Sequence, residues 1–291
     1  MTKIKFEDLL GSGAHFGHVT RKWSPNYKPF ILMEKNGVHI INLEETIRHL
    51  DRALDFIRAT SKKNGEFLFV GTKKQAKDIV QQEADRCSMF YVVERWLGGT
   101  LTNFTTIKKS IKRLHLLEKE GSQIYDNQTK KEIQMLNRER IKLSDQHRGI
   151  KDMRRLPDAV IMVDARLEST AVKEANRLGI PIIAIVDSNT DPTPIKYPIP
   201  ANDDSIRTIQ LIMSVLADTI LHSSSERKKK SDKKVTSAVQ GGEKTTKSND
   251  EQVEAAPEQK EVIAEVQVEE ASPEAVEKEL ADPEKEAEEA K

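Results

Sequence analysis

The sequence predicts an α/β fold built on a parallel sheet, and three observations support this prediction. First, four short runs are apolar at every position, which is typical of strands covered on both faces. These runs are Phe67–Val70, Phe90–Val93, Ala159–Val163 and Ile182–Val186. Second, the segments between them have apolar residues at helical spacing. Third, strands that alternate with helices favour parallel pairing with right-handed crossovers.

The expected helices have an apolar stripe and recognisable ends. The first stripe consists of Leu43, Ile47, Leu50, Leu54 and Ile57. Asn42 is expected to cap this helix, and Glu45 to complete a capping box. The last helix repeats the spacing over residues 206–220, with Asp203 or Asp204 as its cap. A third helix, over residues 168–178, is expected to end at Gly179.

One interval interrupts the alternation of strands and helices. No strand-like run occurs between residues 93 and 159, although a crossover needs far fewer residues. Two apolar stripes, at 104–114 and 133–143, flank a turn-like stretch at 121–128. We therefore expect an inserted α-helical hairpin over residues 104–155, which packs as a coiled coil.

Charge is strongly segregated along this chain of 291 residues, whose formal net charge is zero. Residues 235–291 hold 17 acidic and 6 basic side chains, so the remainder has a net charge of +11. A folded body that basic predicts a polyanionic partner. Residues 235–291 also contain no aromatic residue, so we expect a disordered acidic C-terminal tail. The basic run at 227–234 is either a solvated linker or an arm that contacts phosphates.

These patterns divide the chain into three expected parts. The α/β domain comprises residues 1–103 and 156–226, the hairpin 104–155, and the basic linker with the acidic tail 227–291. Residues 105–155 hold 14 basic and 7 acidic side chains. This excess favours a hairpin that meets phosphates on one side, and a solvated coiled-coil surface is the alternative.

Cysteine usage and hydropathy favour a soluble cytoplasmic protein. The single cysteine, Cys87, excludes an internal disulfide and fits a reducing compartment. The first residues lack the apolar region of a secretory signal. The longest apolar run, Ile180–Val186, is too short to cross a bilayer, so no membrane partner is expected.

The sequence contains no convincing nucleotide loop or catalytic nucleophile. Val70–Lys74 follows a strand and opens a helix, a place where amides often hold phosphate. It lacks the second glycine of the Walker pattern, and no G-x-G-x-x-G or G-x-S-x-G motif occurs. An RNA-contacting loop with Lys73 and Lys74 is favoured, and we expect no small-molecule substrate. Two rival hypotheses are a nucleotide-dependent enzyme on the doubly wound sheet and a coiled-coil adaptor that binds only protein.

Two histidines three residues apart, His15 and His18, suggest a metal site if other ligands converge. The candidate set is His18, Asp187, Asp203 and Asp204. These residues could hold a structural zinc or magnesium ion, although no cofactor is required. In the alternative interpretation the aspartates cap turns and helices, and the histidines bond to backbone or RNA.

Aromatic residues are interleaved with basic residues in two segments, residues 21–28 and Arg95–Trp96. Indole and guanidinium planes stack on unpaired bases while lysines contact phosphates, so both segments predict binding to folded RNA. A buried position in the core is the alternative for Trp96.

Four motifs of this sequence closely resemble those of the bacterial small-subunit ribosomal protein two family. They are G-A-H-F-G-H-V-T-R-K-W at 13–23, R-W-L-G-G-T-L-T-N at 95–103, L-P-D-A-V-I-M-V-D at 156–164 and L-G-I-P-I-I-A-I-V-D-S-N-T-D-P at 178–192. The resemblance covers about residues 3–226 and does not extend to the acidic tail.

The resemblance implies a flavodoxin-like sheet with a protruding coiled-coil hairpin. It also implies a structural component of the small ribosomal subunit, without catalytic activity, that binds ribosomal RNA at the junction of head and body. Docking of ribosomal protein one, and so recruitment of messenger RNA, is a further implied role. The matching positions and the charge pattern together predict an RNA-binding set of His15, Arg21, Lys22, Trp23, Lys28, Lys73, Lys74, Arg95, Trp96, Asn103, Lys108, Lys109, Lys112 and Arg113.

Overall fold

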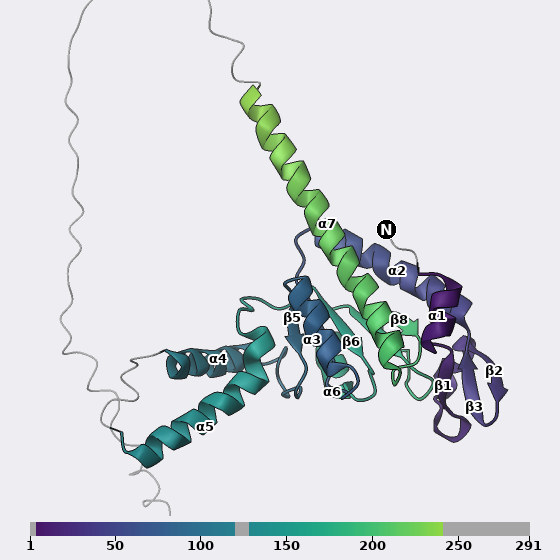
Figure 1. Ribbon diagram of the computed structural model, residues 1–291, viewed down its shortest axis with the longest axis horizontal. Coiled ribbons are helices and arrows are strands. Elements are labelled where there is room, and N and C mark those ends of the chain that lie inside the picture. Colours follow the sequence, from purple (N-terminus) through teal and green to yellow (C-terminus); the bar gives the residue numbers. More distant parts are fainter. Residues whose placement is uncertain (1–3, 120–127, 241–291) are drawn as a thin grey trace, which may run out of the picture. The chain divides into compact units, whose positions relative to one another are not determined.

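A parallel sheet of five strands organises the chain in the computed structural model, which describes residues 4–119 and 128–240 (Figure 1). The strands lie in the order β5-β4-β6-β7-β8, with all neighbours parallel. Their bounds are Phe67–Val70 (β4), Phe90–Val92 (β5), Ala159–Val163 (β6), Ile182–Val186 (β7) and Tyr197–Pro200 (β8). This order is flavodoxin-like, and it confirms the four predicted strands. The prediction missed β8, an edge strand where two prolines are tolerated.

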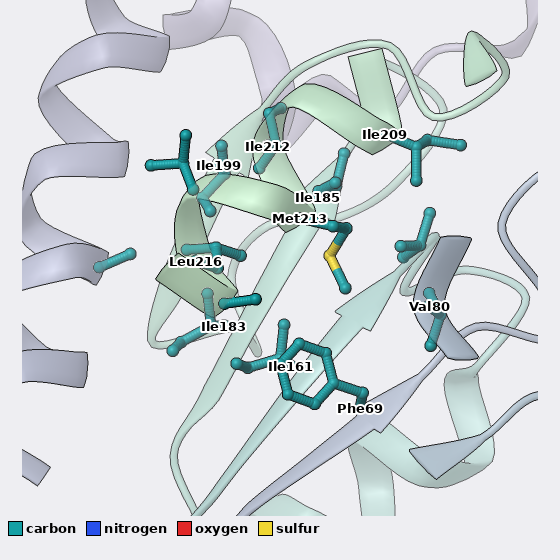
Figure 2. Packing of buried hydrophobic residues seen from close by; sticks show 14 of the residues in the cluster. Phe69, Val80, Ile161, Ile183, Ile185, Ile199, Ile209, Ile212, Met213 and Leu216 are labelled. Atoms are coloured by element: carbon teal, nitrogen blue, oxygen red, sulfur yellow. The ribbon is translucent and has the colours of Figure 1, made fainter. Parts of the chain in front are cut away.

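Helices cover both faces of this sheet because its side chains alternate between two cores. Phe67 and Phe69 of β4 face one core, and Leu68 and Val70 face the other. The first core is covered by α2 (Leu43–Lys62), α3 (Lys77–Arg86) and α7 (Ile206–Gln240), and the second by α6 (Ser169–Arg177). In Figure 2, Met213 and Leu216 of α7 lie over the sheet residues Phe69, Ile161 and Ile183.

The predicted helix ends are partly confirmed. The Glu44 N–H donates to Asn42 Oδ1 at 3.0 Å, so Asn42 caps α2. Glu45 does not complete a capping box and instead pairs with Arg48 at 2.6 Å. The capping side chain of α7 is Ser205, whose Oγ accepts from the Thr208 N–H at 3.4 Å. The prediction of Asp203 or Asp204 as this cap is wrong, because both carboxylates bind a lysine. Gly179 ends α6 with a φ of +70°, as predicted.

The N-terminal segment forms elements that the sequence analysis did not predict. Helix α1 (Phe6–Ser12) precedes an antiparallel sheet in the order β1-β3-β2, and short 3-10 turns follow β1. The strands are Phe16–Val19 (β1), Ile31–Lys35 (β2) and Val38–Ile41 (β3). They are short, and polar residues interrupt or end the apolar run within each of them. The buried Tyr27 hydroxyl donates to Val186 O at 3.0 Å and ties this segment to β7.

Two further helices, α4 (Phe104–Glu118) and α5 (Lys130–His147), occupy the interval predicted as a hairpin. They contact each other, and Arg113 Nε lies 3.1 Å from Glu139 Oε1. Ile107 and Ile111 anchor α4 in the second core. The coiled-coil winding stays a prediction, and the expected turn lies almost wholly outside the described residues.

The C-terminal helix α7 continues to Gln240, through the basic run where the sequence predicted a linker from residue 227. The expected disordered tail falls, from residue 241 onward, outside the described residues. Within the described part of the chain, no helix is long and apolar enough to cross a membrane.

Candidate nucleic-acid interface

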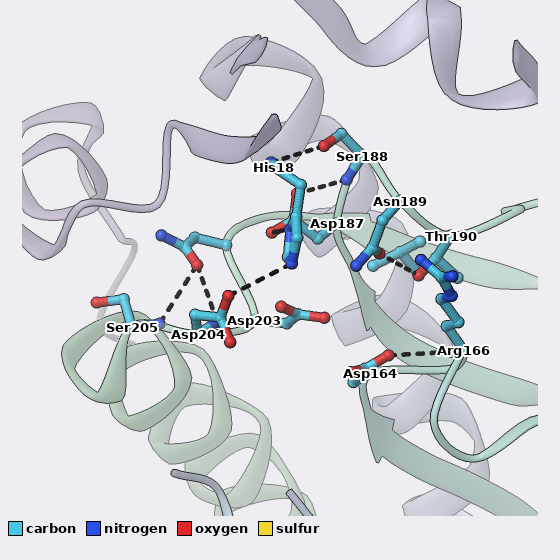
Figure 3. Close-up of polar contacts among 12 residues, drawn as sticks. His18, Asp164, Arg166, Asp187, Ser188, Asn189, Thr190, Asp203, Asp204 and Ser205 are labelled. Atoms are coloured by element: carbon cyan, nitrogen blue, oxygen red, sulfur yellow. Dashed lines mark hydrogen bonds and ion pairs between the residues drawn. The ribbon is translucent and has the colours of Figure 1, made fainter. Parts of the chain in front are cut away.

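A cluster of charged side chains lies at the carboxyl ends of the parallel strands (Figure 3). Its members are Lys73, Asp164, Asp187, Asp203 and Asp204 from the loops of the main sheet, with His18 from β1. Carboxyl ends of parallel strands meet at one edge, and β4 and β6 flank the point where the strand order reverses. Ligands of such folds bind at this point.

Lys73 neutralises part of this cluster. Its Nζ lies 2.8 Å from Asp203 Oδ1 and 2.6 Å from Asp204 Oδ1, with Asp164 Oδ2 at 3.6 Å. Although burial opposes the charge, hydrogen bonds to Asp203 and Asp204 raise the pKa of Lys73. With 14% of its side chain exposed, Lys73 serves the cluster and is poorly placed for the predicted phosphate contact. Its exposed neighbour Lys74 remains available to RNA.

Asp203 is completely buried, and one of its oxygens has no partner. Burial raises its pKa to about 7, with the nearby carboxylates of Asp164 and Asp187 adding to the effect and Lys73 opposing it. Its Oδ2 accepts no hydrogen bond from any described residue. A buried acceptor without a partner is costly, so this oxygen favours a ligand.

His18 faces the same oxygens. Its Nδ1 lies 2.8 Å from Asp187 Oδ2, and its Nε2 lies 3.4 Å from Asp204 Oδ2. The hydrogen bond to Asp187 raises the pKa of His18, with burial opposing it. Ligand atoms of His18, Asp203 and Asp204 lie within 4.8 Å of one another, so three of the four predicted metal ligands converge. Asp187 instead orients the imidazole, as carboxylates beside metal-binding histidines commonly do.

Trp96 belongs to the second core, which favours the alternative interpretation of this residue. It is 9% exposed, and its Nε1–H donates to Glu174 Oε1 at 3.2 Å. The N–H groups of Gly99 and Leu101 donate to the same carboxylate at 2.8 and 3.0 Å. Its indole is therefore not free to stack on an RNA base. Glu174, which organises this loop, was missed because a single helical glutamate has no distinctive sequence pattern.

The exposed basic residues of the N-terminal segment lie beside other basic residues that the sequence analysis missed. Arg21, Lys22 and Lys28 are exposed, as are Lys74, Arg95 and Asn103 in the other predicted segments. Lys22 and Trp23 line a hollow together with Arg166 and Lys173. The position of Arg166 just after a predicted strand was the only signal for it in the sequence.

The helix pair α4 and α5 presents a second basic surface. Lys109 and Lys112 are exposed and make no ion pair with a described residue. Lys108 is half-buried, with its Nζ donating to Arg154 O at 2.5 Å, and Arg113 pairs with Glu139. On α5, five more exposed bases have no ion pair among the described residues: Lys130, Lys131, Arg138, Arg140 and Lys142.

His15 lies on the N-terminal sheet in a mainly apolar setting. It lines a hollow of about 540 Å³ on the N-terminal sheet, with Phe16, Met33 and Ile40 among its neighbours. Burial lowers the pKa of His15. Phe16 and Met33 are 50% and 53% exposed, so this surface is apolar and accessible.

Comparison with known proteins gives consistent matches over the described body. The family model for ribosomal protein S2 matches residues 9–223. The chain is 53% identical over 237 residues to small ribosomal subunit protein uS2 of Chloroherpeton thalassium, covering 81% of this chain and 95% of the relative. The protein of the same name from Chlorobium phaeovibrioides is 52% identical over 76% of this chain and 87% of the relative. That of Bifidobacterium adolescentis is 49% identical over 80% and 86%.

Proposed function

The chain belongs to the ribosomal protein S2 family, and from this premise we propose that it holds ribosomal RNA in the small subunit through its basic surfaces. It is a structural component of the small ribosomal subunit and not an enzyme. It works in the cytoplasm as part of the ribosome, with ribosomal RNA and other ribosomal proteins as partners. The junction of head and body is the proposed position.

The observation that carries this proposal is the distribution of basic side chains that have no ion-pair partner among the described residues. Arg21, Lys22 and Lys28 on one segment, and Lys109 and Lys112 on α4, are exposed without carboxylate partners among the described residues. Free cations on the 3-10 turns after β1 and on α4 suit a phosphate backbone, because each contact releases condensed counterions.

Sedimentation of a cell extract tests the proposal directly. The protein is expected to migrate with the small subunit and to leave that position after ribonuclease treatment. A protein-only adaptor would keep its complexes after ribonuclease, and that result would contradict the proposal.

A second proposed role is the docking of ribosomal protein one, with its consequence for messenger RNA recruitment. The accessible apolar surface around Phe16 and Met33 supports it, because such patches mark protein contacts. Met33→Lys should reduce the amount of ribosomal protein one on purified subunits. Leu167→Lys, at an exposed leucine elsewhere, is the control. Equal content in both variants would argue against this surface.

A third proposal concerns the polar cluster, which we infer binds a divalent cation. Lys73 takes the Oδ1 atoms of Asp203 and Asp204, which leaves the unpartnered Asp203 Oδ2 and the Asp204 Oδ2 facing His18 Nε2. An imidazole with two carboxylates suits zinc better than magnesium, which prefers oxygen ligands.

Elemental analysis of the purified full chain tests this cation site. His18→Ala should lower the bound metal below that of the wild type, whereas His222→Ala, at an exposed histidine, should not. Equal substoichiometric content in all three proteins would refute the site.

A further inference from the structure

A hollow of about 530 Å³ lies beside the loops that follow β6 and β7 and the first turns of α6. Lys22 and Trp23 line it from the N-terminal segment, and Lys173 lines it from α6. The side chain of Arg166 extends from the loop after β6 toward Asn189 and Thr190 (Figure 3). Its volume lies within the range of sites that bind small ligands.

The lining of this hollow has a net positive charge. Lys22, Arg166 and Lys173 make no ion pair with any described residue. Asp191 is the one carboxylate among the lining residues, and its Oδ1 already accepts from Asn26 Nδ2 at 3.1 Å and from the Thr193 hydroxyl at 2.7 Å. The hollow therefore attracts an anionic group.

The same lining offers an aromatic ring and a free amide donor. Trp23 is 37% exposed, and its ring is held by His39, with centroids 5.3 Å apart. Asn189 Oδ1 accepts from the Thr190 hydroxyl at 2.8 Å, which orients the side-chain amide. Its Nδ2 has no partner among the described residues. An indole beside guanidinium, ammonium and amide donors matches a planar base joined to a phosphate.

We propose that this hollow binds one unpaired ribonucleotide, with its base on Trp23 and its phosphate at Arg166 and Lys173. The inference rests on the proposed RNA-binding function and names the ligand of one of its sites. A looped-out nucleotide in an RNA strand and a free nucleotide present the same chemistry, so the test includes both.

The two tryptophans of this chain provide the readout. In ¹⁵N-labelled protein, titration with single-stranded penta-adenylate should move the indole N–H resonance of Trp23. The resonance of Trp96, which is buried against Glu174, should stay in place. Tighter binding of penta-adenylate than of adenosine monophosphate would identify a strand as the source of the nucleotide. Equal affinity would identify a free nucleotide.

Variants separate stacking from charge. Trp23→Leu should weaken binding about tenfold and Trp23→Phe much less, because a phenyl ring still stacks. Arg166→Ala and Lys173→Ala should weaken binding and reduce its salt dependence. Arg177→Ala is the matched control, since Arg177 is an exposed base on the same helix and does not line the hollow.

Two results would overturn the inference: a Trp23 resonance that responds to neither ligand, or equal losses from Arg177→Ala and Lys173→Ala. Sedimentation of the wild-type protein judges the proposed function separately. A protein that migrates with small subunits, but whose Trp23 resonance does not move on titration, would refute this inference alone. A protein that never migrates with them would refute the proposed function.

Discussion

Glu174 illustrates how one buried carboxylate shapes a loop. Its two oxygens accept from the Trp96 indole and from the backbone N–H groups of Gly99, Leu101 and Thr102. Gly99 has a φ of +91°, a left-handed conformation in which glycine is favoured. Gly99 thus allows a tight turn whose amides point at one anion, and Trp96 is held in the core by the same carboxylate.

Replacing Glu174 should destabilise the fold. Glu174→Ala leaves buried N–H groups without acceptors, and each such group costs roughly 1–3 kcal/mol, so a total loss of about 3 kcal/mol is expected. Glu174→Gln retains one acceptor oxygen and should lose less. Urea unfolding measures both changes, with Glu44→Gln, at an exposed glutamate, as the control. A loss of under about 0.5 kcal/mol for Glu174→Ala, the range of ordinary surface changes, would contradict this account.

The same residue predicts a pH dependence of stability. Burial opposes ionisation of Glu174, but hydrogen bonds from Gly99 and Leu101 outweigh it and lower the pKa of the carboxyl. A lowered folded-state pKa adds stability above the unfolded-state value, and this contribution is lost as the pH falls through the folded value. The stability advantage of the wild type over Glu174→Gln should be constant near neutral pH and should shrink below about pH 4.5. Urea unfolding at several pH values measures this gap, and a gap that widens in acid would exclude the mechanism.

At the scale of elements, the helix pair α4 and α5 contains basic residues that make contacts within the protein and others that make none among the described residues. Lys108 is committed to Arg154 O and lies 4.7 Å from the centre of the Phe104 ring, and Arg113 is committed to Glu139. Lys109 and Lys112 have no such role. Charge reversal at these last two positions therefore changes the surface without removing a contact that holds α4 in place.

The double variant Lys109→Glu with Lys112→Glu should lower the occupancy of small subunits and leave the circular dichroism spectrum unchanged. If both lysines contact phosphates, the logarithmic salt slope of RNA binding should fall by about two. Lys62→Glu with Lys63→Glu, at exposed positions near the end of α2, introduces the same charge elsewhere. Equal occupancy for both double variants would exclude α4 as an RNA-binding element.

At the scale of the whole molecule, the charge of the acidic segment opposes that of the body. Residues 241–291 hold all 17 acidic and 6 basic side chains counted from residue 235, so residues 1–240 have a net charge of +11. Opposite charges of equal size on one chain should weaken long-range attraction to any polyanion, and low salt strengthens such attraction.

Deletion of residues 241–291 should therefore strengthen binding to an unrelated RNA at low salt. The effect should become smaller near physiological ionic strength, where the screening length is about 8 Å. Fluorescence anisotropy with a labelled RNA at two salt concentrations measures the difference. Unchanged affinity at low salt would show that the acidic segment does not shield the body.

Local patterns in the sequence were sufficient to predict most of the fold. A run that is apolar at every position, such as Ile182–Val186, must be buried on both faces, and helical stripes such as that of α2 must face a core. The family motifs and the segregation of charge can likewise be identified from the order of the residues alone. The short strands β1 to β3 escaped prediction because polar residues interrupt or end the apolar run within each strand.

The tertiary structure alone decided which distant residues meet. Lys73 and Asp203 meet because β4 and β8 end at one edge of the parallel sheet, and His18 joins them because β1 of the antiparallel sheet lies against the loop after β7. No local period in the sequence reports either contact. The sequence suggests that Trp96 stacks on an RNA base. In the structure its indole N–H donates instead to Glu174, which lies far along the chain. Folding likewise places Trp23 in the same hollow as Arg166 and Lys173, which are distant from it in the sequence. Periodicity records whether a side chain is buried, whereas the partner of that side chain depends on how the strands are ordered in the sheet.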